Sequence, residues 1–172
     1  MEYAIGTIGL RLAISSINGI SDAARNISFL GSSLYTSVDA NKEIIRYLAQ
    51  IDIVNTIKVL DTMLKEMNIG KDTPNTLVTC LSAIHDTIVE IEQEIRDIQM
   101  RLEYNRSLYI GRGFRSYKFH NSKARMALLH EKLVARKDLF FKILPLQKNL
   151  HKTDKPMILH DSWIAAEENV VA

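Results

Sequence analysis

The chain has 172 residues, 47% hydrophobic and 24% charged, which is an ordinary globular composition and enough to bury a core. Its single cysteine, Cys80, excludes a disulfide framework and a cysteine-based metal site, and it favours a reducing compartment. We therefore expect a cytoplasmic protein, either peripheral to a membrane or part of a particle. We expect one bundle domain over residues 1–150 and a tail over residues 151–172.

The net charge of +2 is unevenly distributed along the chain. Residues 1–100 carry 8 basic and 13 acidic side chains, a net charge of −5, whereas residues 101–155 carry 14 and 4, a net charge of +10. The remaining residues carry −3. This asymmetry indicates an anionic partner of the basic segment: membrane lipid, an acidic protein or, as a weaker candidate, nucleic acid. The alternative is that acidic and basic helices pair with each other inside the bundle.

The first predicted helix is the least polar part of the chain. Arg11 is its only charge between residues 3 and 20, and Glu2 at the start argues against a secretory signal. Several glycines and serines keep its hydrophobicity too low for a convincing membrane span. We expect the range 31–33 to end this helix. Its apolar stripe is Ala13, Ile17, Ile20, Ala24, Ile27 and Leu34.

The second predicted helix has an apolar stripe that changes frame. Ile44, Leu48 and Ile51 begin the stripe, and Ile53, Ile57, Leu60, Leu64 and Met67 continue it in a shifted frame. We interpret the shift as one helix that touches two neighbours. Gly70 is expected to end it, and the short connection makes the second and third helices antiparallel.

The third predicted helix, over residues 77–102, gives the clearest signal. Asp72 or Thr73 can cap it, and Pro74 suits its first turn. Because a seam this long needs partners, the sequence predicts an all-α fold, an antiparallel four-helix bundle with a short C-terminal helical or extended tail. The seam recurs at steps of three and four: Leu77, Leu81, Ile84, Ile88, Ile91, Ile95, Ile98 and Leu102.

A basic and aromatic connector separates the third helix from the fourth. Asn121 or Ser122 is the expected cap of the fourth helix, and Pro145 is expected to end or kink it. Its apolar residues are Met126, Leu129, Leu133, Phe140 and Ile143. The predicted contacts to an anionic partner or lipid are Arg106, Arg112, Arg115, Lys118, Lys123 and Arg125, with Tyr109 and Phe114 as interface aromatics.

The tail contains the only tryptophan, Trp163, among apolar neighbours. We expect Trp163 to be buried as an anchor, against its own bundle or in a neighbouring subunit. No nucleotide-binding, hydrolase or zinc motif is present, and the five histidines lack metal-binding spacing. We therefore expect no enzyme activity, no cofactor, no metal and no small-molecule substrate.

Several stretches resemble a known family. The run "IVEIEQEIRDIQMRLEYNRS", the connector "LYIGRGFRSYKF" and the run "ARMALLHEKLVARKDLFFKIL" are similar to the last two helices of HeLo-type domains, which include the bundle of the mixed lineage kinase domain-like protein. The opening "AIGTIGLRLA" resembles their first helix. The resemblance implies a bundle that self-associates and contacts anionic lipids in cell-death or defence signalling.

Two functions follow as expectations. The first is a non-enzymatic interaction protein that binds its own copies or other protein subunits, as a structural component of a larger assembly such as a viral particle. The alternative is a HeLo-like bundle that engages membranes through the basic residues, with residues 5–14 as the inserting segment.

Overall fold

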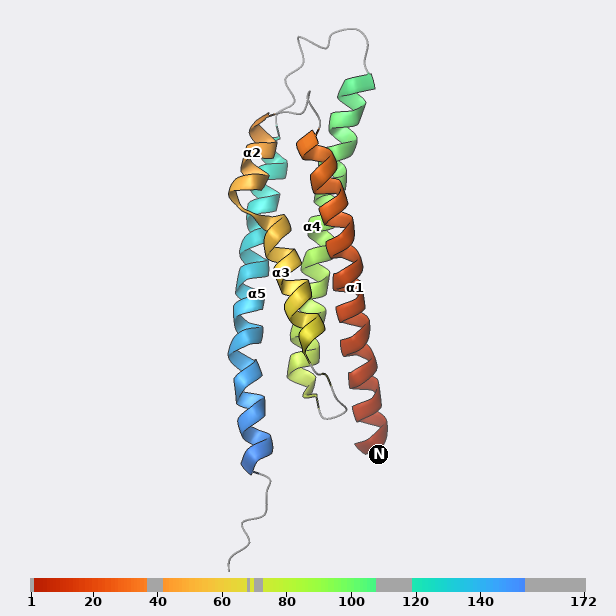
Figure 1. Cartoon of the computed structure of the whole chain (residues 1–172), viewed down its shortest axis with the longest axis vertical. Helices are drawn as coiled ribbons and strands as arrows, with labels where there is room; N and C mark the ends of the chain where they lie inside the picture. Colours follow the sequence, from red (N-terminus) through yellow and green to blue (C-terminus); the bar gives the residue numbers. More distant parts are fainter. Residues whose placement is uncertain (1, 37–41, 68, 70–72, 108–118, 154–172) are drawn as a thin grey trace, which may run out of the picture.

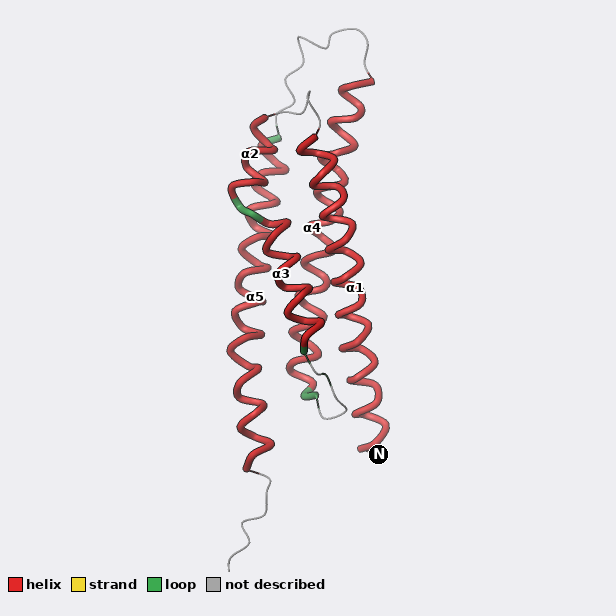
Figure 2. Tube along the Cα trace, viewed as in Figure 1, coloured by secondary structure: helices red, strands yellow, loops and turns green. Residues whose placement is uncertain are grey.

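The computed structural model describes residues 2–36, 42–67, 69, 73–107 and 119–153. Within these ranges the chain is helical apart from short connections, and no strand occurs (Figure 2). The helices are α1 (Glu2–Thr36), α2 (Lys42–Gln50), α3 (Ile53–Glu66), α4 (Asn75–Ser107) and α5 (His120–Thr153). The prediction of an all-α fold is confirmed.

The long helices form an up-down-up-down bundle (Figure 1). α1 and α4 run in one direction, and α3 and α5 run in the other, while α2 lies at the end of the bundle beside the beginning of α5. The closest backbone approaches join α1 to α4, α4 to α5 and α1 to α3. The predicted antiparallel four-helix bundle is confirmed, with α2 and α3 together in the second position.

α1 and α4, which share the most extensive backbone contact in the bundle, run parallel to each other. The side chain of Asn26 donates a hydrogen bond to Glu92 Oε1 at 3.0 Å, across 66 positions of the chain. A Cβ atom added at Gly19 would collide with the imidazole of His85, which is again 66 positions away. Since the same offset recurs along both helices, they run side by side in register. Gly19 allows this approach because it has no side chain.

The predicted seam of α4 forms the centre of the core. Its members from Leu77 to Ile98 are buried, and Leu102 packs against the core with partial exposure. The stripe of α1 is buried as well, except for the partly buried Ile17. Both amphipathic patterns are therefore confirmed, since each buries its apolar side on the other helices.

The single second helix expected from the sequence is wrong, because the chain breaks between α2 and α3. Asp52 adopts the left-handed conformation, with φ 46° and ψ 37°. The amide of Asp52 donates to the carbonyl of Ala49 at 3.2 Å and closes α2, and its own carbonyl accepts from Thr56 at 3.0 Å and opens α3. The frame shift in the apolar pattern marks this break rather than a wide apolar face.

The expected end of α1 at residues 31–33 is also wrong, because α1 continues to Thr36. Gly31 is buried against α3, where an added Cβ atom would lie 3.2 Å from Val54 Cγ2. The hydroxyl of Ser32 donates to the carbonyl of Ser28 at 2.8 Å within the helix. These residues therefore pack and bond inside α1 instead of terminating it.

The fourth predicted helix, α5, differs from expectation at both ends. Its first bond runs from the amide of Lys123 to the carbonyl of Phe119 at 2.9 Å, so Asn121 and Ser122 lie inside the first turn and neither is the cap. Pro145 lies inside the helix, which continues to Thr153, so of the two expectations for Pro145 the end of the helix is wrong. Because Pro145 is exposed, water can reach the helix at the position where proline removes a hydrogen bond.

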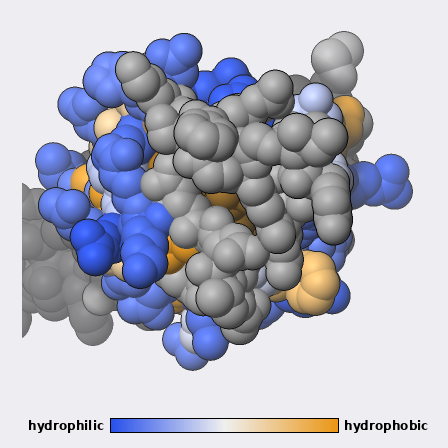
Figure 3. All heavy atoms as spheres, turned by 90° about the horizontal axis from the view of Figure 1, so that it is seen from above, coloured by the Kyte–Doolittle hydropathy of each residue, from blue (hydrophilic) through white to orange (hydrophobic). Residues whose placement is uncertain are grey.

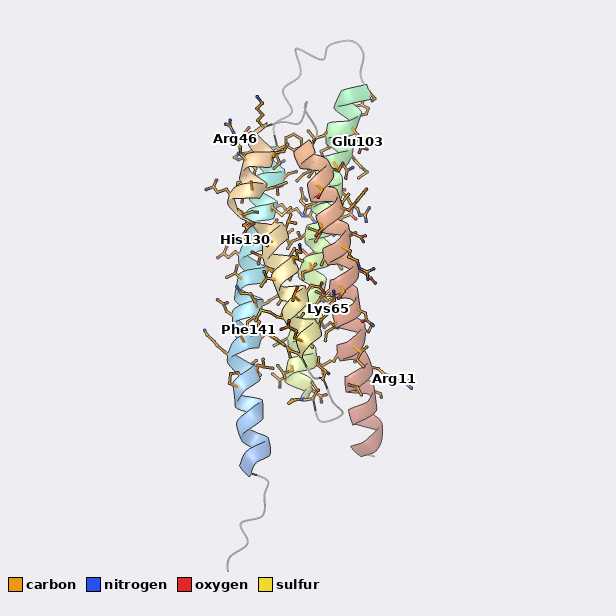
Figure 4. The ribbon with its side chains drawn as sticks, in the orientation of Figure 1. Arg11, Arg46, Lys65, Glu103, His130 and Phe141 are labelled. Atoms are coloured by element: carbon orange, nitrogen blue, oxygen red, sulfur yellow. The ribbon has the colours of Figure 1, made fainter. Side chains whose placement is uncertain are left out.

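The described residues around one end of the bundle are mostly hydrophilic. Viewed from the end, hydrophilic residues make up most of the visible outline, with hydrophobic residues at a few places (Figure 3). The side chains of Arg11 and Arg46 point away from the bundle at opposite ends (Figure 4). Among the described residues, no helix has both the length and the hydropathy needed to cross a membrane.

Candidate interaction surface

Polar contacts connect α4 to α5 along their length. Arg125 Nε lies 3.3 Å from Glu94 Oε2, and only 5% of the Glu94 side chain is exposed. Arg136 of α5 donates through Nη1 to the carbonyl of Ala83, at 2.5 Å, and to the hydroxyl of Thr87. Basic side chains of α5 thus bond to acceptors on α4, as the pairing alternative in the sequence analysis expects.

Lys123 connects α5 to α2. Its Nζ atom lies 2.5 Å from Glu43 Oε1 and 5.7 Å from the centre of the Tyr47 ring. The hydrogen bond from Lys123, followed by its positive charge, lowers the pKa of Glu43 below the ordinary carboxyl value, and the charge of His120 acts in the same direction. We call Glu43, Tyr47 and Lys123 the α2 latch.

The lowered pKa of Glu43 can be tested directly. We expect the Glu43 carboxyl to titrate at lower pH in the native protein than in the Lys123→Met variant, because the ammonium stabilises the carboxylate. The contact is present above the ordinary carboxyl pKa and is lost as the pH falls through the lowered value. NMR titration of the side-chain carboxyl carbons measures both values. Identical values in the two proteins would contradict the contact.

The structure describes only part of the predicted anionic-partner set. The side chains of Lys123 and Arg125 form ion pairs within the bundle. Arg106 lies in the last turns of α4, but its side chain is outside the described residues. The remaining predicted site residues also lie outside the described residues: Tyr109, Arg112, Phe114, Arg115, Lys118 and Trp163. Binding of an anionic partner or lipid by this set stays a prediction.

A polar cluster surrounds the buried side chain of Asp61. Asp61 of α3 accepts from the hydroxyl of Ser21 at 2.5 Å and from Lys65 Nζ at 2.6 Å. Within the described ranges, no three or more histidine, cysteine or acidic side chains are placed to share a metal ion. The bond from Ser21 to Asp61 joins α1 to α3.

Large apolar side chains lie on the outside of several helices. The most exposed is Phe29, at 72%. An open groove of about 380 Å³ follows the end of α4, lined by Asp97, Met100, Arg101 and Tyr104. The exposed set is Ile8, Leu12, Ile14, Phe29, Val59, Met63, Val89, Met100, Tyr104, Leu128 and Leu139.

One exposed set is ordered along a single helix. Ala124, Leu128, Ala135 and Leu139 are all exposed on α5, at steps of four, seven and four. At about 3.6 residues per turn, this spacing places them on one side of the helix. We call these four residues the α5 outer stripe. It lies away from the buried residues of α5, such as Met126 and Phe140.

Sequence reasoning missed the α5 outer stripe because it followed only one apolar pattern in this helix. The buried residues Met126, Leu129, Leu133 and Phe140 recur at steps of three, four and seven. The second pattern was present in the same sequence, with two leucines separated by eleven residues, about three turns. A helix with two apolar sides has two surfaces to cover.

Together these features define a helical bundle with polar contacts between its helices and an uncovered apolar stripe on its last helix. Comparison of the chain with protein-family models, with curated proteins and with solved structures gives no match.

Proposed function

We propose that the protein is a non-enzymatic assembly module whose bundle binds other copies of the chain or other helical protein subunits. The observation that carries the proposal is the α5 outer stripe. Leu128 and Leu139 are 53% and 52% exposed, so both leave apolar surface in water. Covering such surface with another helix is favourable, at roughly 25 cal/mol per Å² of apolar area.

The chemistry around the stripe suits a protein partner. Exposed Glu131 and Asp138 lie on one side of it, and exposed Arg125 and partly buried Lys132 lie on the other. An apolar line bordered by charges of both signs is typical of a helix that packs on another helix, since the apolar residues supply affinity and the charges supply orientation. A single exposed leucine is common on protein surfaces and does not by itself indicate a binding site.

The test is a double substitution in the stripe. We expect Leu128→Glu with Leu139→Glu to weaken self-association of the full chain at least tenfold, because two carboxylates in the contact would lose their hydration. Sedimentation velocity and light scattering over a range of protein concentrations measure the oligomeric state. Circular dichroism checks that the helices remain.

The matched control places the same two charges elsewhere. Phe29→Glu with Val89→Glu changes exposed apolar residues of α1 and α4, outside the α5 outer stripe. We expect this control to associate like the unmodified protein. A monodisperse monomer at high concentration, with no other subunit bound, would contradict the proposed function.

A further inference from the structure

α2 is the least integrated helix of the bundle. It takes no part in the three closest backbone approaches between helices. Of its residues, only Ile44 and Leu48 are buried. The contacts of the latch, between Glu43, Tyr47 and Lys123, link it to α5. Ile45 and Tyr47 pack on the core with partial exposure. A short helix with few fully buried residues can separate from a bundle without unfolding the longer helices.

The apolar sides of α2 and α3 do not match in a continuous helix. Ile44 precedes Ile53 by nine residues, and Leu48 precedes Ile57 by nine residues; all four are buried. Nine residues are about two and a half turns of an α-helix. If α2 continued α3 without a break, its apolar side would face away from the core. The break at Asp52 is what turns both apolar sides inward.

Asp52 is the residue that makes the break. It is exposed, and it is the one non-glycine residue with positive φ in the part of the chain that the structure describes. The left-handed conformation is unfavourable for residues with a Cβ atom, and aspartate tolerates it better than most. The broken form therefore contains a local strain that a continuous helix does not have.

The surface beneath α2 is apolar and comes from three helices. Leu48 and Ile45 of α2 border a small cavity together with Leu34 of α1, Ile53 of α3 and Ile95 of α4. We call Leu34, Ile53 and Ile95 the α2 site. When α2 turns away, this site and the apolar side of α2 are uncovered together, and Lys123 loses its contact with Glu43.

We propose that α2 is an exchangeable lid, which turns about Ile51 and Asp52 and whose vacated site takes the α2 helix of a second copy. The inference rests on the proposed self-association in naming a second copy as the occupant. The partner is set by complementarity: the α2 site already borders Ile45 and Leu48, and Lys123 already pairs with Glu43. A second copy presents the same apolar side and the same carboxylate.

Complementary charge reversals test the exchange. The Glu43→Lys protein has two cations in its latch, and the Lys123→Glu protein has two anions, so neither latch forms within its own chain. When the two proteins exchange α2, each introduced charge meets its opposite, and both latches are restored. We expect a heterodimer on mixing, identified by native mass spectrometry, at no less than ten times the level of either homodimer.

The double variant Glu43→Lys with Lys123→Glu is the matched control. It carries the same substitutions but restores the latch inside one chain, so we expect it to behave like the unmodified protein. Absence of the heterodimer, with both single variants folded by circular dichroism, overturns the exchange. Loss of association in the α5 outer stripe variant leaves this result unchanged, so failures of the two proposals are distinguishable.

The hinge at Asp52 can also be tested by an experiment that does not depend on self-association. Asp52→Gly and Asp52→Ala both remove the carboxylate, which accepts from Asn55 Nδ2 at 3.2 Å, but only glycine is comfortable in the left-handed conformation. We expect the amides of α2 to exchange with solvent about five- to thirtyfold faster in Asp52→Ala than in Asp52→Gly. Equal rates in the two variants, or exchange of α2 only together with α3, would overturn the lid.

Discussion

Ile88→Ala should lower the free energy of unfolding by about 3 kcal/mol, within the range of roughly 2–5 kcal/mol for truncation of a buried aliphatic side chain. Ile88 has no exposed surface and lies in the middle of the α4 seam. Removing three carbon atoms there loses their transfer free energy and leaves a cavity, because the neighbouring helices can close over it only in part.

The adjacent residue provides the control. Val89 is 43% exposed, so Val89→Ala removes carbon atoms that are largely in water already. We expect a loss below about 0.5 kcal/mol, the usual range for a surface substitution. Urea unfolding of both variants gives the free energies, and the midpoint of thermal unfolding should fall by about 6–12 °C for Ile88→Ala. Equal losses in the two variants would mean that α4 is not the centre of the core.

The α4 seam could be predicted because one helix reports its buried side through its own spacing. Leu77 to Leu102 repeat at steps that only one side of a helix satisfies, whatever packs against it. The stripe of α1 is of the same kind. Such patterns indicate the fold class, because two long amphipathic helices with short connections have few ways to bury their apolar sides.

The sequence contains a signal of the break at Asp52, which is the shift in the apolar pattern, but the interpretation of this shift as one continuous helix is wrong. A shift in the apolar frame can come from a wide apolar side or from a broken helix, and both keep the same residues apolar. Composition does not decide between them, because aspartate is not the usual residue for the left-handed conformation. Only the rotation of about half a turn between Ile44 and Ile53 favours the break.

The parallel packing of α1 on α4 is a second feature that one-helix patterns do not reveal. It depends on which small residue meets which large one across the pair, as Gly19 meets His85. A glycine within a helix indicates weak helix propensity when it is considered alone. In the bundle, the same glycine allows α1 to approach α4 at His85.

The candidate site was harder to predict because the partner of a charge is not written in the sequence. The net charge of their segment predicts an external anionic partner for Arg125 and Lys123. In the bundle their nearest opposite charges are Glu94 and Glu43, on helices far away along the chain. Net charge cannot distinguish a cation that faces a partner from one that is neutralised inside the fold.

Arg125→Ala should therefore lower the free energy of unfolding by about 2 kcal/mol, even though Arg125 itself is 60% exposed. The loss comes from Glu94, whose side chain is 5% exposed and would lose its neighbouring guanidinium. Removing one partner of a fully buried ion pair costs about 3–5 kcal/mol. The value expected here is smaller, because water reaches the exposed arginine and screens the pair.

A second variant removes both charges of the pair. Glu94→Leu with Arg125→Leu should be within about 1 kcal/mol of the unmodified protein, since an apolar pair avoids the desolvation of the carboxylate. Lys137→Ala is the surface control: its ammonium lies 3.8 Å from Asp138, whose side chain is 55% exposed, and we expect a change below about 0.5 kcal/mol. Urea unfolding at neutral pH measures all four proteins.

Comparison of Arg125→Ala with the double variant separates two roles for Arg125. If the double variant recovers the stability that Arg125→Ala loses, the guanidinium serves mainly to neutralise Glu94, and part of the positive charge of the later segment is used inside the bundle. If Arg125→Ala is no less stable than the unmodified protein, Glu94 does not depend on the pair. The guanidinium, exposed on the side of α5 beside Leu128, would then be available to a partner.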